Sequence, residues 1–434
     1  MGSKRLNRRE FSKLSVATLG GALTGAFLGS CETMGGGRDG EPPSNAAKGK
    51  SKGKGTDPEG NSGMFIPSRD RDRYYPPPES KGGWRLFESP DQVRDLARMD
   101  PEKLDDLFKS QAFQHGGAQW SIVIIRHGYV AREYYTFNIP IPTRFNIWSG
   151  TKSFTGTAWG LLLEASRQNQ LPDGRQVDLD SPAYPFIAEG YPLTDPRKER
   201  ITVRHLLTMT SGTPGHESGC IGMPIAPAHG AFEHALGRSP NRHGGRAEKL
   251  VGEPGTQWVY SDIGMQHLSL AFANIMGVEM GDFMQERIFA PIGIEELSWS
   301  LLGGRGFMGP HSNGDSGIYV SSRELARFGY LALHNGVWDG QQLIPAWWMD
   351  LATKASQTMN STYGYTWWVN SEGALWPDLP MMASLPRDAF ALRGYNSNRC
   401  FVIPSLDLVV ARVGSGPVGW NEQGFMGGIV DAMI

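Results

Sequence analysis

Strand-forming residues gather at the two ends of the folded part of this chain, and a long helical stretch separates them. Near the beginning, 120–125 is apolar and β-branched, His127-Gly128 supplies a turn, and 129–136 continues as a second strand. Near the end, strands are predicted at 367–369, 390–392, 399–403 and 406–413. Between about residues 155 and 335 the apolar spacing is mostly helical. This order predicts an α/β (α+β) fold, in which both chain ends build one antiparallel sheet around a large helical insertion.

Several of the predicted helices have recognisable starts. Asp100-Pro101 predicts a helix over 102–112, because a capping aspartate is followed by proline at the first helical position. Thr202 is a candidate cap for another helix, and Ser261 or Asp262 caps one that runs to Met276. The aligned apolar residues of 322–333 predict a further helix.

Composition excludes several classes of function. The chain has 434 residues, 39% of them hydrophobic, and its formal net charge of −2 predicts no broad attraction to nucleic acid. Its three cysteines, Cys31, Cys220 and Cys400, form no metal-binding cluster, so no zinc site is expected. Cys220 and Cys400 are predicted to be buried thiols, with pairing in an oxidising compartment as the alternative. No dinucleotide or phosphate loop is present, and we expect no cofactor.

The first 31 residues are predicted to be an export signal. Paired arginines at 8 and 9 precede a short apolar run, which is too short for a stable anchor, and they resemble a twin-arginine signal. The segment ending at Cys31 resembles a bacterial lipobox, so Cys31 is a candidate for lipidation. Residues 32–83 lack core-forming residues and are predicted to be a flexible tether, followed by a folded domain over 84–434. A periplasmic or cell-surface protein held to a membrane by lipid is expected.

The segment Ser149-Gly150-Thr151-Lys152 is the best candidate for a nucleophile with its own base. A serine hydroxyl needs a group that accepts its proton, and a lysine three residues further along a helix lies on the same face. Burial of Lys152 would lower its pKa and make it a base. The spacing alone is weak, because Ser51 and Lys54 also match it, and Ser149 is otherwise expected to be a helix cap.

The segment 145–154 resembles the nucleophile motif of the penicillin-recognising serine hydrolases. This superfamily includes class C β-lactamases, D-alanyl-D-alanine peptidases, and related esterases and amidases such as 6-aminohexanoate-dimer hydrolases. Four further blocks resemble the family in the expected order: 177–182, 201–212, 289–294 and 317–328. The resemblance implies a β-lactamase/transpeptidase-like fold and an acyl-enzyme on Ser149, formed from a small ester or amide.

The family's second motif, Tyr-x-Asn, falls on Tyr260-Ser261-Asp262. By resemblance Tyr260 carries a proton beside Ser149 and Lys152, and a nearby ammonium favours its phenolate. Asp262 replaces the asparagine and is a candidate substrate-binding residue. A carboxylate cannot donate a hydrogen bond as an amide does, so Asp262 is expected instead to hold Lys152 charged or to cap the following helix.

The third motif, normally Lys-Thr-Gly, is best matched by Leu392-Arg393-Gly394. Gly394 would allow close approach of substrate, and the N–H groups of Ser149 and Tyr395 would form the oxyanion hole. Arg393, Asn396 and Trp148 are further candidates for substrate binding. The lysine that meets a β-lactam carboxylate is absent, which favours an esterase or amidase over a β-lactamase.

Three alternatives remain open at this stage. One is a D-alanyl-D-alanine peptidase or β-lactamase, and another is a binding lipoprotein without activity. The third is a chymotrypsin-like protease that uses Ser316 in Gly314-Asp315-Ser316-Gly317, although the partner histidine motif is missing. The sequence does not indicate the oligomeric state.

Overall fold

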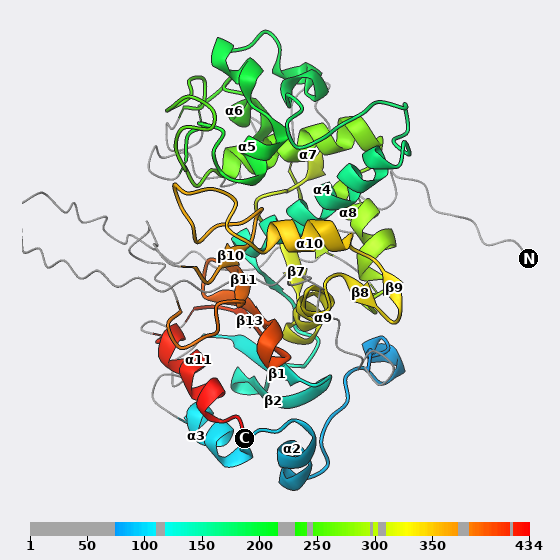
Figure 1. Cartoon of the computed structure of the whole chain (residues 1–434), viewed down its shortest axis with the longest axis vertical. Helices are drawn as coiled ribbons and strands as arrows, with labels where there is room; N and C mark the ends of the chain where they lie inside the picture. Colours follow the sequence, from blue (N-terminus) through cyan, green and yellow to red (C-terminus); the bar gives the residue numbers. More distant parts are fainter. Residues whose placement is uncertain are drawn as a thin grey trace, which may run out of the picture. The chain divides into compact units, whose positions relative to one another are not determined.

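The computed structural model describes residues 74–109, 118–215, 231–240, 246–295, 298–302, 310–371, 382–416 and 420–434. The described residues belong to one compact unit, which is drawn in Figure 1. The predicted export signal with Cys31, most of the tether, and Cys220 lie outside the described residues. Within the described residues, no helix has the length and apolarity needed to cross a bilayer.

The main sheet has six antiparallel strands in the order β10-β11-β12-β13-β1-β2. Its strands are β1 (Trp120–Arg126), β2 (Tyr129–Tyr135), β10 (Trp368–Val369), β11 (Phe390–Gly394), β12 (Asn398–Ile403) and β13 (Leu408–Gly414). Strand β1 pairs with β13 over its whole length, from Trp120 opposite Gly414 to Arg126 opposite Leu408. The predicted sheet made from both chain ends is therefore confirmed.

The β1–β2 hairpin forms because two residues with positive φ connect the strands. His127 has φ 51° and Gly128 has φ 77°, which matches the two-residue turn favoured by twisted strands. The predicted turn at these residues is confirmed.

Each face of the sheet is covered by helices. On one face Ile122, Ile124 and Val410 pack with α3 (Pro101–Lys109) and α11 (Glu422–Asp431). On the other, Val123, Val409 and Ala411 join the larger core, and α9 (Ser322–Leu333) packs across β12 and β13. Strand β13 is buried at every position, as expected for a strand covered on both faces.

The helical insertion gathers at one end of the unit, with the sheet between it and α2, α3 and α11 (Figure 1). Within the insertion, α5, α6 and α8 pack around α4 and α7. The bounds of these helices are α4 (Thr151–Arg167), α5 (Val203–Leu207), α6 (Ala231–Ala235), α7 (Asp262–Met276) and α8 (Met280–Met284). Outside the insertion lie α2 (Pro90–Leu96) and α10 (Ala346–Ala352). The predicted caps are confirmed for α5, where Thr202 accepts from His205 N, and for α7, where Ser261 accepts from Gly264 N.

Small sheets that the sequence did not predict interrupt the insertion. A three-stranded sheet has the order β3-β7-β4, built from β3 (Phe145–Asn146), β7 (Ile318–Val320) and β4 (Ser298–Trp299). Two-stranded pairs join β5 (Leu301–Leu302) to β6 (His311–Ser312), and β8 (Val337–Trp338) to β9 (Gln341–Gln342). Pairing β3 with β7 brings the residues before Ser149 against the Ile318 segment.

Helix α3 spans Pro101–Lys109, and residues 110–112 of the predicted helix over 102–112 lie outside the described residues, so its end stays a prediction. The boundary predicted for the tether differs from the structure. The end of the predicted tether, 74–83, packs on α9: Arg327 Nη1 donates to the Pro76 carbonyl at 2.8 Å, and Arg327 Nη2 to Glu79 Oε1 at 2.8 Å. A buried arginine therefore holds residues that low apolar content had assigned to a free linker.

Candidate active site

Ser149 lies in a tight turn, η5 (Trp148–Gly150), immediately before α4. Trp148 has φ +50°, a strained conformation for a bulky residue. Asn146 Oδ1 accepts from Trp148 N at 2.8 Å, and Ile147 N donates to the Ile318 carbonyl at 3.0 Å. The predicted helix therefore starts two residues later, at Thr151. Ser149 lies in the turn just before the N-terminus of α4.

Lys152 faces Ser149 from the first turn of α4. Its Nζ is 2.9 Å from Ser149 Oγ, and the Lys152 residue is 2% exposed. The predicted pairing of the serine with the lysine three residues later is therefore present in the geometry.

Tyr260 is placed by the segment before α7. Val259 N donates to the Met209 carbonyl at 2.8 Å, and Ser261 Oγ donates to the Pro214 carbonyl at 2.7 Å. Gly215 lies so close that a Cβ there would be 2.3 Å from the Tyr260 carbonyl oxygen. The sequence block that begins at Ile201 thus holds the tyrosine in place.

The Tyr260 side chain completes a cluster with Ser149 and Lys152. Its hydroxyl hydrogen-bonds with both side chains, and Lys152 Nζ lies 5.0 Å from the centroid of the ring. The ring stacks against Trp368 with centroids 6.1 Å apart. Burial raises the pKa of Tyr260 above its ordinary value, although the Lys152 ammonium acts in the opposite direction. At neutral pH this side chain is a phenol.

Asp262 forms an ion pair with Lys152 inside the protein. The distance from Lys152 Nζ to Asp262 Oδ1 is 2.7 Å, with side chains 3% and 6% exposed. Burial by itself lowers the pKa of Lys152, but the Asp262 carboxylate, with Tyr260 and Asp315, more than offsets it. The pKa of Lys152 is therefore raised, contrary to the expectation that burial would leave it a neutral base. Of the roles weighed for Asp262, the geometry favours holding Lys152 charged; the side chain that caps α7 is Ser261.

Asp315 is a member of this cluster that the sequence did not reveal. Lys152 Nζ donates to the Asp315 backbone carbonyl at 3.0 Å, and the Asp315 residue is 2% exposed. Its carboxyl hydrogen-bonds with Gln266 of α7, while Oδ1 has no partner among the described residues. Burial first, and then the Asp262 carboxylate, raise the pKa of Asp315 to about 8. The segment Gly314-Asp315-Ser316-Gly317 was weighed only for Ser316, and nothing in it predicts that Asp315 meets Lys152, 163 residues away in the sequence.

Helix α4 fixes the Asp315 loop through three neighbouring polar residues. Thr155 Oγ1 donates to the Gly314 carbonyl at 2.8 Å, and Thr151 Oγ1 accepts from Ile318 N at 3.2 Å. Lys152 supplies the third contact, described above. A Cβ at Gly314 would lie 2.4 Å from Ser269 Oγ of α7, so the loop sits tightly between the two helices. The Asp315 carboxyl is thus held in a packed site.

Strand β11 forms the other wall next to Ser149. A Cβ at Gly394 would lie 1.9 Å from the Ile147 carbonyl oxygen, so only glycine allows this approach to η5. Tyr395 follows directly, and its ring meets Trp148 edge-on with centroids 5.8 Å apart. The close backbone approach agrees with the predicted oxyanion hole, formed by the N–H groups of Ser149 and Tyr395.

Arg393, another candidate from the third motif, does not face Ser149. Leu392 packs against Gly150, so Arg393, its neighbour in the strand, faces the other side. There Arg393 Nη2 pairs with Glu422 Oε1 of α11 at 2.7 Å, which corrects the prediction that Arg393 binds substrate beside Ser149. Asn396 lies in the following turn with φ 59°, and its carbonyl accepts from Arg412 Nη1 at 3.0 Å. A substrate contact of the Asn396 side chain stays a prediction.

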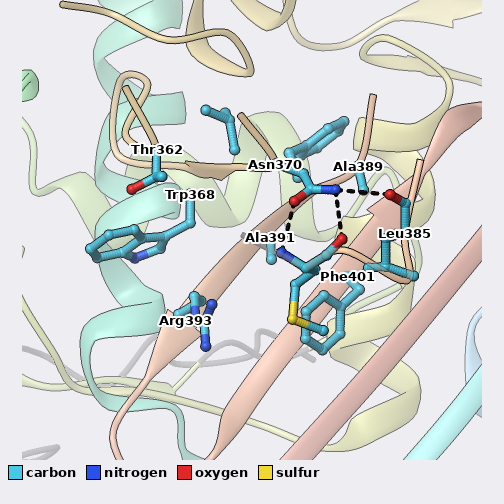
Figure 2. Close-up of a pocket in the computed structure, with 11 residues that line it drawn as sticks. Thr362, Trp368, Asn370, Leu385, Ala389, Ala391, Arg393 and Phe401 are labelled. Carbon is cyan, nitrogen blue, oxygen red and sulfur yellow. Dashed lines mark hydrogen bonds between the residues drawn. The ribbon is translucent and has the colours of Figure 1, made fainter. Parts of the chain in front are cut away.

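A pocket lies beside β10 and β11, with Trp368 and Arg393 among the residues that line it (Figure 2). Asn370 holds two other residues of the pocket wall in place: its Nδ2 donates to the carbonyls of Met382 and Leu385 at 3.1 and 3.0 Å. Most of the other lining side chains are apolar. Ser149 is not among them, and Trp368 connects this pocket with Tyr260.

Other predicted groups do not form a second site. Ser316 Oγ accepts from Asn313 Nδ2 at 3.1 Å, as expected for a polar loop. Cys400 is a buried thiol whose pKa burial raises. Among the described residues, no group of three or more His, Cys, Asp and Glu side chains is arranged to hold a metal ion.

Comparison with known proteins decides the family. Residues 104–422 match the Beta-lactamase family, which is most of the chain. The chain belongs to the beta-lactamase family. An uncharacterized protein of Alkalihalophilus pseudofirmus is 24% identical over 307 residues, covering 64% of this chain and 76% of that protein.

Solved structures share the beta-lactamase fold with this family member. The penicillin binding protein from Bacillus halodurans has a TM-score of 0.52 and 17% identity, covering 76% of this chain and 99% of its own. EstCE1, a hydrolase with promiscuous acyltransferase activity, has a TM-score of 0.55 and 17% identity, covering 76% and 97%. The predicted fold class and family are confirmed, and the chain is a member of the serine hydrolase superfamily.

Proposed function

We propose that this protein cleaves an ester or amide bond through an acyl-enzyme intermediate on Ser149. The observation that supports this proposal is the contact of Ser149 Oγ with Lys152 Nζ at 2.9 Å, with the Tyr260 hydroxyl touching both. Side chains in mutual contact that each carry a transferable proton provide a path by which the Ser149 proton can leave and a proton can reach the leaving group.

The reaction follows from the positions of these groups. Ser149 Oγ attacks the substrate carbonyl, and its proton passes into the Lys152 and Tyr260 cluster. The N–H groups of Ser149 and Tyr395 stabilise the oxyanion. Tyr260 then protonates the leaving group, and water releases the acid from Ser149 in a second cycle of the same steps.

The β11 wall favours substrates without a carboxylate beside the scissile bond. Leu392 occupies the place of the family's lysine and is fully buried, while Arg393 is paired with Glu422 on the other side of the strand. No cation of the third motif thus faces Ser149. A neutral ester or amide therefore fits this wall better than a β-lactam does.

Replacement of the nucleophile tests the proposal. Ser149→Ala is expected to abolish hydrolysis of a short-chain p-nitrophenyl ester and labelling by a fluorophosphonate probe. Ser316→Ala is the matched control, since it removes another serine hydroxyl near the cluster, and it should retain labelling at Ser149. Activity that persists in Ser149→Ala but disappears in Ser316→Ala would instead identify a chymotrypsin-like protease.

The same preparation separates the remaining alternatives. Rapid acylation by a labelled penicillin would favour a D-alanyl-D-alanine peptidase or β-lactamase. A wild-type protein that reacts with neither probe would be a binding protein without activity.

We propose in addition that the protein is exported and held at a membrane through lipid on Cys31. The support is the order of the arginine pair, the short apolar run and Cys31 in the sequence. Wild-type protein should then fractionate with membranes when expressed in a bacterium, and Cys31→Ser should move it to the soluble fraction. Equal distribution of the two proteins would contradict this.

A further inference from the structure

The ammonium of Lys152 is surrounded by acceptors. Besides the Tyr260 hydroxyl, Lys152 Nζ has three partners: it donates to Ser149 Oγ at 2.9 Å and to the Asp315 carbonyl at 3.0 Å, and it forms an ion pair with Asp262 Oδ1 at 2.7 Å. Because the pKa of Lys152 is raised, the group holds all three protons at neutral pH. It therefore has no lone pair for the Ser149 proton until one of its own protons leaves. The Asp262 carboxylate is the strongest acceptor among the three.

The other neighbour of Ser149 is no better as a base. Burial keeps the Tyr260 hydroxyl protonated, so Tyr260 can accept a proton only if it gives up its own at the same time. The resting cluster thus contains a hydroxyl, a phenol and an ammonium in contact. The basic group nearest to them is the carboxylate on the far side of Lys152.

A second carboxyl group limits the negative charge in the cluster. Asp315 lies in the same packed site, and two carboxylates beside one ammonium would leave a buried surplus charge. Because burial and Asp262 raise its pKa to about 8, Asp315 is a neutral acid at neutral pH. The two carboxyl groups together then carry one proton, on Asp315, and one negative charge, on Asp262.

We propose that Asp262 and Asp315 form an acid pair that sets the proton balance of Ser149, with Asp262 receiving the serine proton through Lys152 and Asp315 remaining protonated. This inference rests on the proposed function, because it describes the acylation step of that reaction. Both residues act through Lys152 and do not touch the substrate, so they are positioning residues.

The proton transfers balance in this scheme. As Ser149 Oγ forms its bond to the carbonyl carbon, the carbonyl electron pair moves to oxygen, the serine proton moves to Lys152 Nζ, and one Lys152 proton moves to Asp262. When the intermediate collapses, the bond to the leaving group breaks and Tyr260 gives that group a proton. Tyr260 is reprotonated by Lys152, which recovers its proton from Asp262. The enzyme is thereby restored to its starting protonation, with Ser149 acylated.

The ionisable and polar groups that face the acid pair come from each packed element. Helix α4 contributes Lys152, α7 contributes Gln266, and the segment before α7 contributes Tyr260. Tyr363 also lies near, and its pKa is raised by burial and then by Tyr260 and Asp262. Of these, Asp315 is the group whose titration falls just above neutral pH.

The pH dependence of ester hydrolysis by the full chain tests the proposal. Wild-type kcat/KM for p-nitrophenyl acetate should fall above about pH 8, because ionised Asp315 adds a second negative charge to the buried cluster and so disfavours the further negative charge that develops on the oxyanion. Asp315→Asn resembles the neutral acid, so it should keep the neutral-pH rate and lose this alkaline fall. Asp262→Asn removes the proton acceptor and should lower kcat/KM about a hundredfold near neutral pH. Asp195→Asn, which removes another buried and paired carboxylate, is the control and should leave the pH profile unchanged.

Two results would overturn the acid pair while leaving the proposed function intact. They are an alkaline fall that persists in Asp315→Asn, and wild-type kcat/KM in Asp262→Asn, each in a protein that still labels with fluorophosphonate. If Asp262→Asn does not fold, the Asp315→Asn profile decides alone. Failure of the wild type to label or to hydrolyse any ester would contradict the proposed function itself.

Discussion

Lys152 and Lys198 are both buried, and their partners among the described residues differ in whether they include a carboxylate. Lys152 Nζ contacts a carboxylate, a hydroxyl and a carbonyl. Lys198 Nζ contacts the Thr194 hydroxyl at 2.7 Å and the carbonyls of Leu236 and Ala247 at 3.1 and 3.2 Å, without a carboxylate. Burial by itself lowers the pKa of a lysine, and it is the main reason why the pKa of Lys198 is lowered to about 8. For Lys152 the adjacent Asp262 reverses the direction.

The comparison shows that burial and hydrogen-bond number do not decide the charge of a lysine. Both ammonium groups are buried and hydrogen-bonded, yet the pKa is raised only for the one beside a carboxylate. The Lys198 ammonium joins the segment 194–198 to the segments around Leu236 and Ala247. Lys152, by contrast, belongs to a cluster in which the position of a proton matters.

The largest expected effect is that of Lys152→Met. It removes the charge that pairs with Asp262 and should eliminate detectable ester hydrolysis. It also leaves a buried carboxylate without its partner, which typically destabilises a protein by about 3–5 kcal/mol. Ester assays and urea unfolding measure both effects. Retained activity would show that the reaction does not use this ammonium.

A smaller effect is expected for Lys198→Met. This change leaves the acceptors around Thr194 without a hydrogen-bond donor. Because Lys198 contacts no carboxylate among the described residues, no buried charge is left unpaired, and about 1–3 kcal/mol of stability should be lost. The kcat of ester hydrolysis should stay near the wild-type value under conditions where the protein is folded. A loss of stability equal to that of Lys152→Met would remove the distinction between the two sites.

The smallest expected effect is on the pH dependence of stability. The pKa of Lys198 is about 8 in the folded protein and has an ordinary value of 10.5. Between these values the unfolded chain binds a proton that the folded protein has released, so stability rises with pH. Relative to Lys198→Met, the wild type should gain on the order of 2 kcal/mol across this window. Lys152, with a raised pKa, contributes no such rise, and its ion pair stays intact below pH 10.5.

Urea unfolding of both proteins at intervals from about pH 7 to about pH 10 measures the difference directly. Parallel curves for the wild type and Lys198→Met would mean that Lys198 keeps its proton and that neutral acceptors suffice to hold a buried ammonium.

The sequence predicted the sheet and the long helices well, because they carry strong periodic patterns and caps. The helix over 322–333 and the start of α7 at its Ser261 cap match the structure. The strands β3, β4 and β7 have two or three residues each, too few for a period to be recognised. Their pairing depends on contacts between distant segments, which local patterns do not encode.

The candidate site was predicted where a motif carries it. Ser149, Lys152 and Tyr260 were found in this way, and the structure brings them together. The sequence left two outcomes open for Lys152, a pKa lowered by burial or a charge held by Asp262, and the tertiary contact with Asp262 favours the second. Asp315 was missed because its neighbours in sequence indicate only a polar loop. The side of β11 that Arg393 faces became clear only from the packing of Leu392 and Gly394 on η5.

The arginine that holds residues 76–79 against α9 has a practical consequence. Arg327 is fully buried, and Pro76, Pro77 and Glu79 all accept hydrogen bonds from it. A truncated protein that starts at Trp84 would lack these acceptors, and the buried guanidinium of Arg327 would lose three of its hydrogen bonds. Soluble versions prepared for kinetics should therefore keep the chain from Tyr74 onward, even though the sequence there looks dispensable.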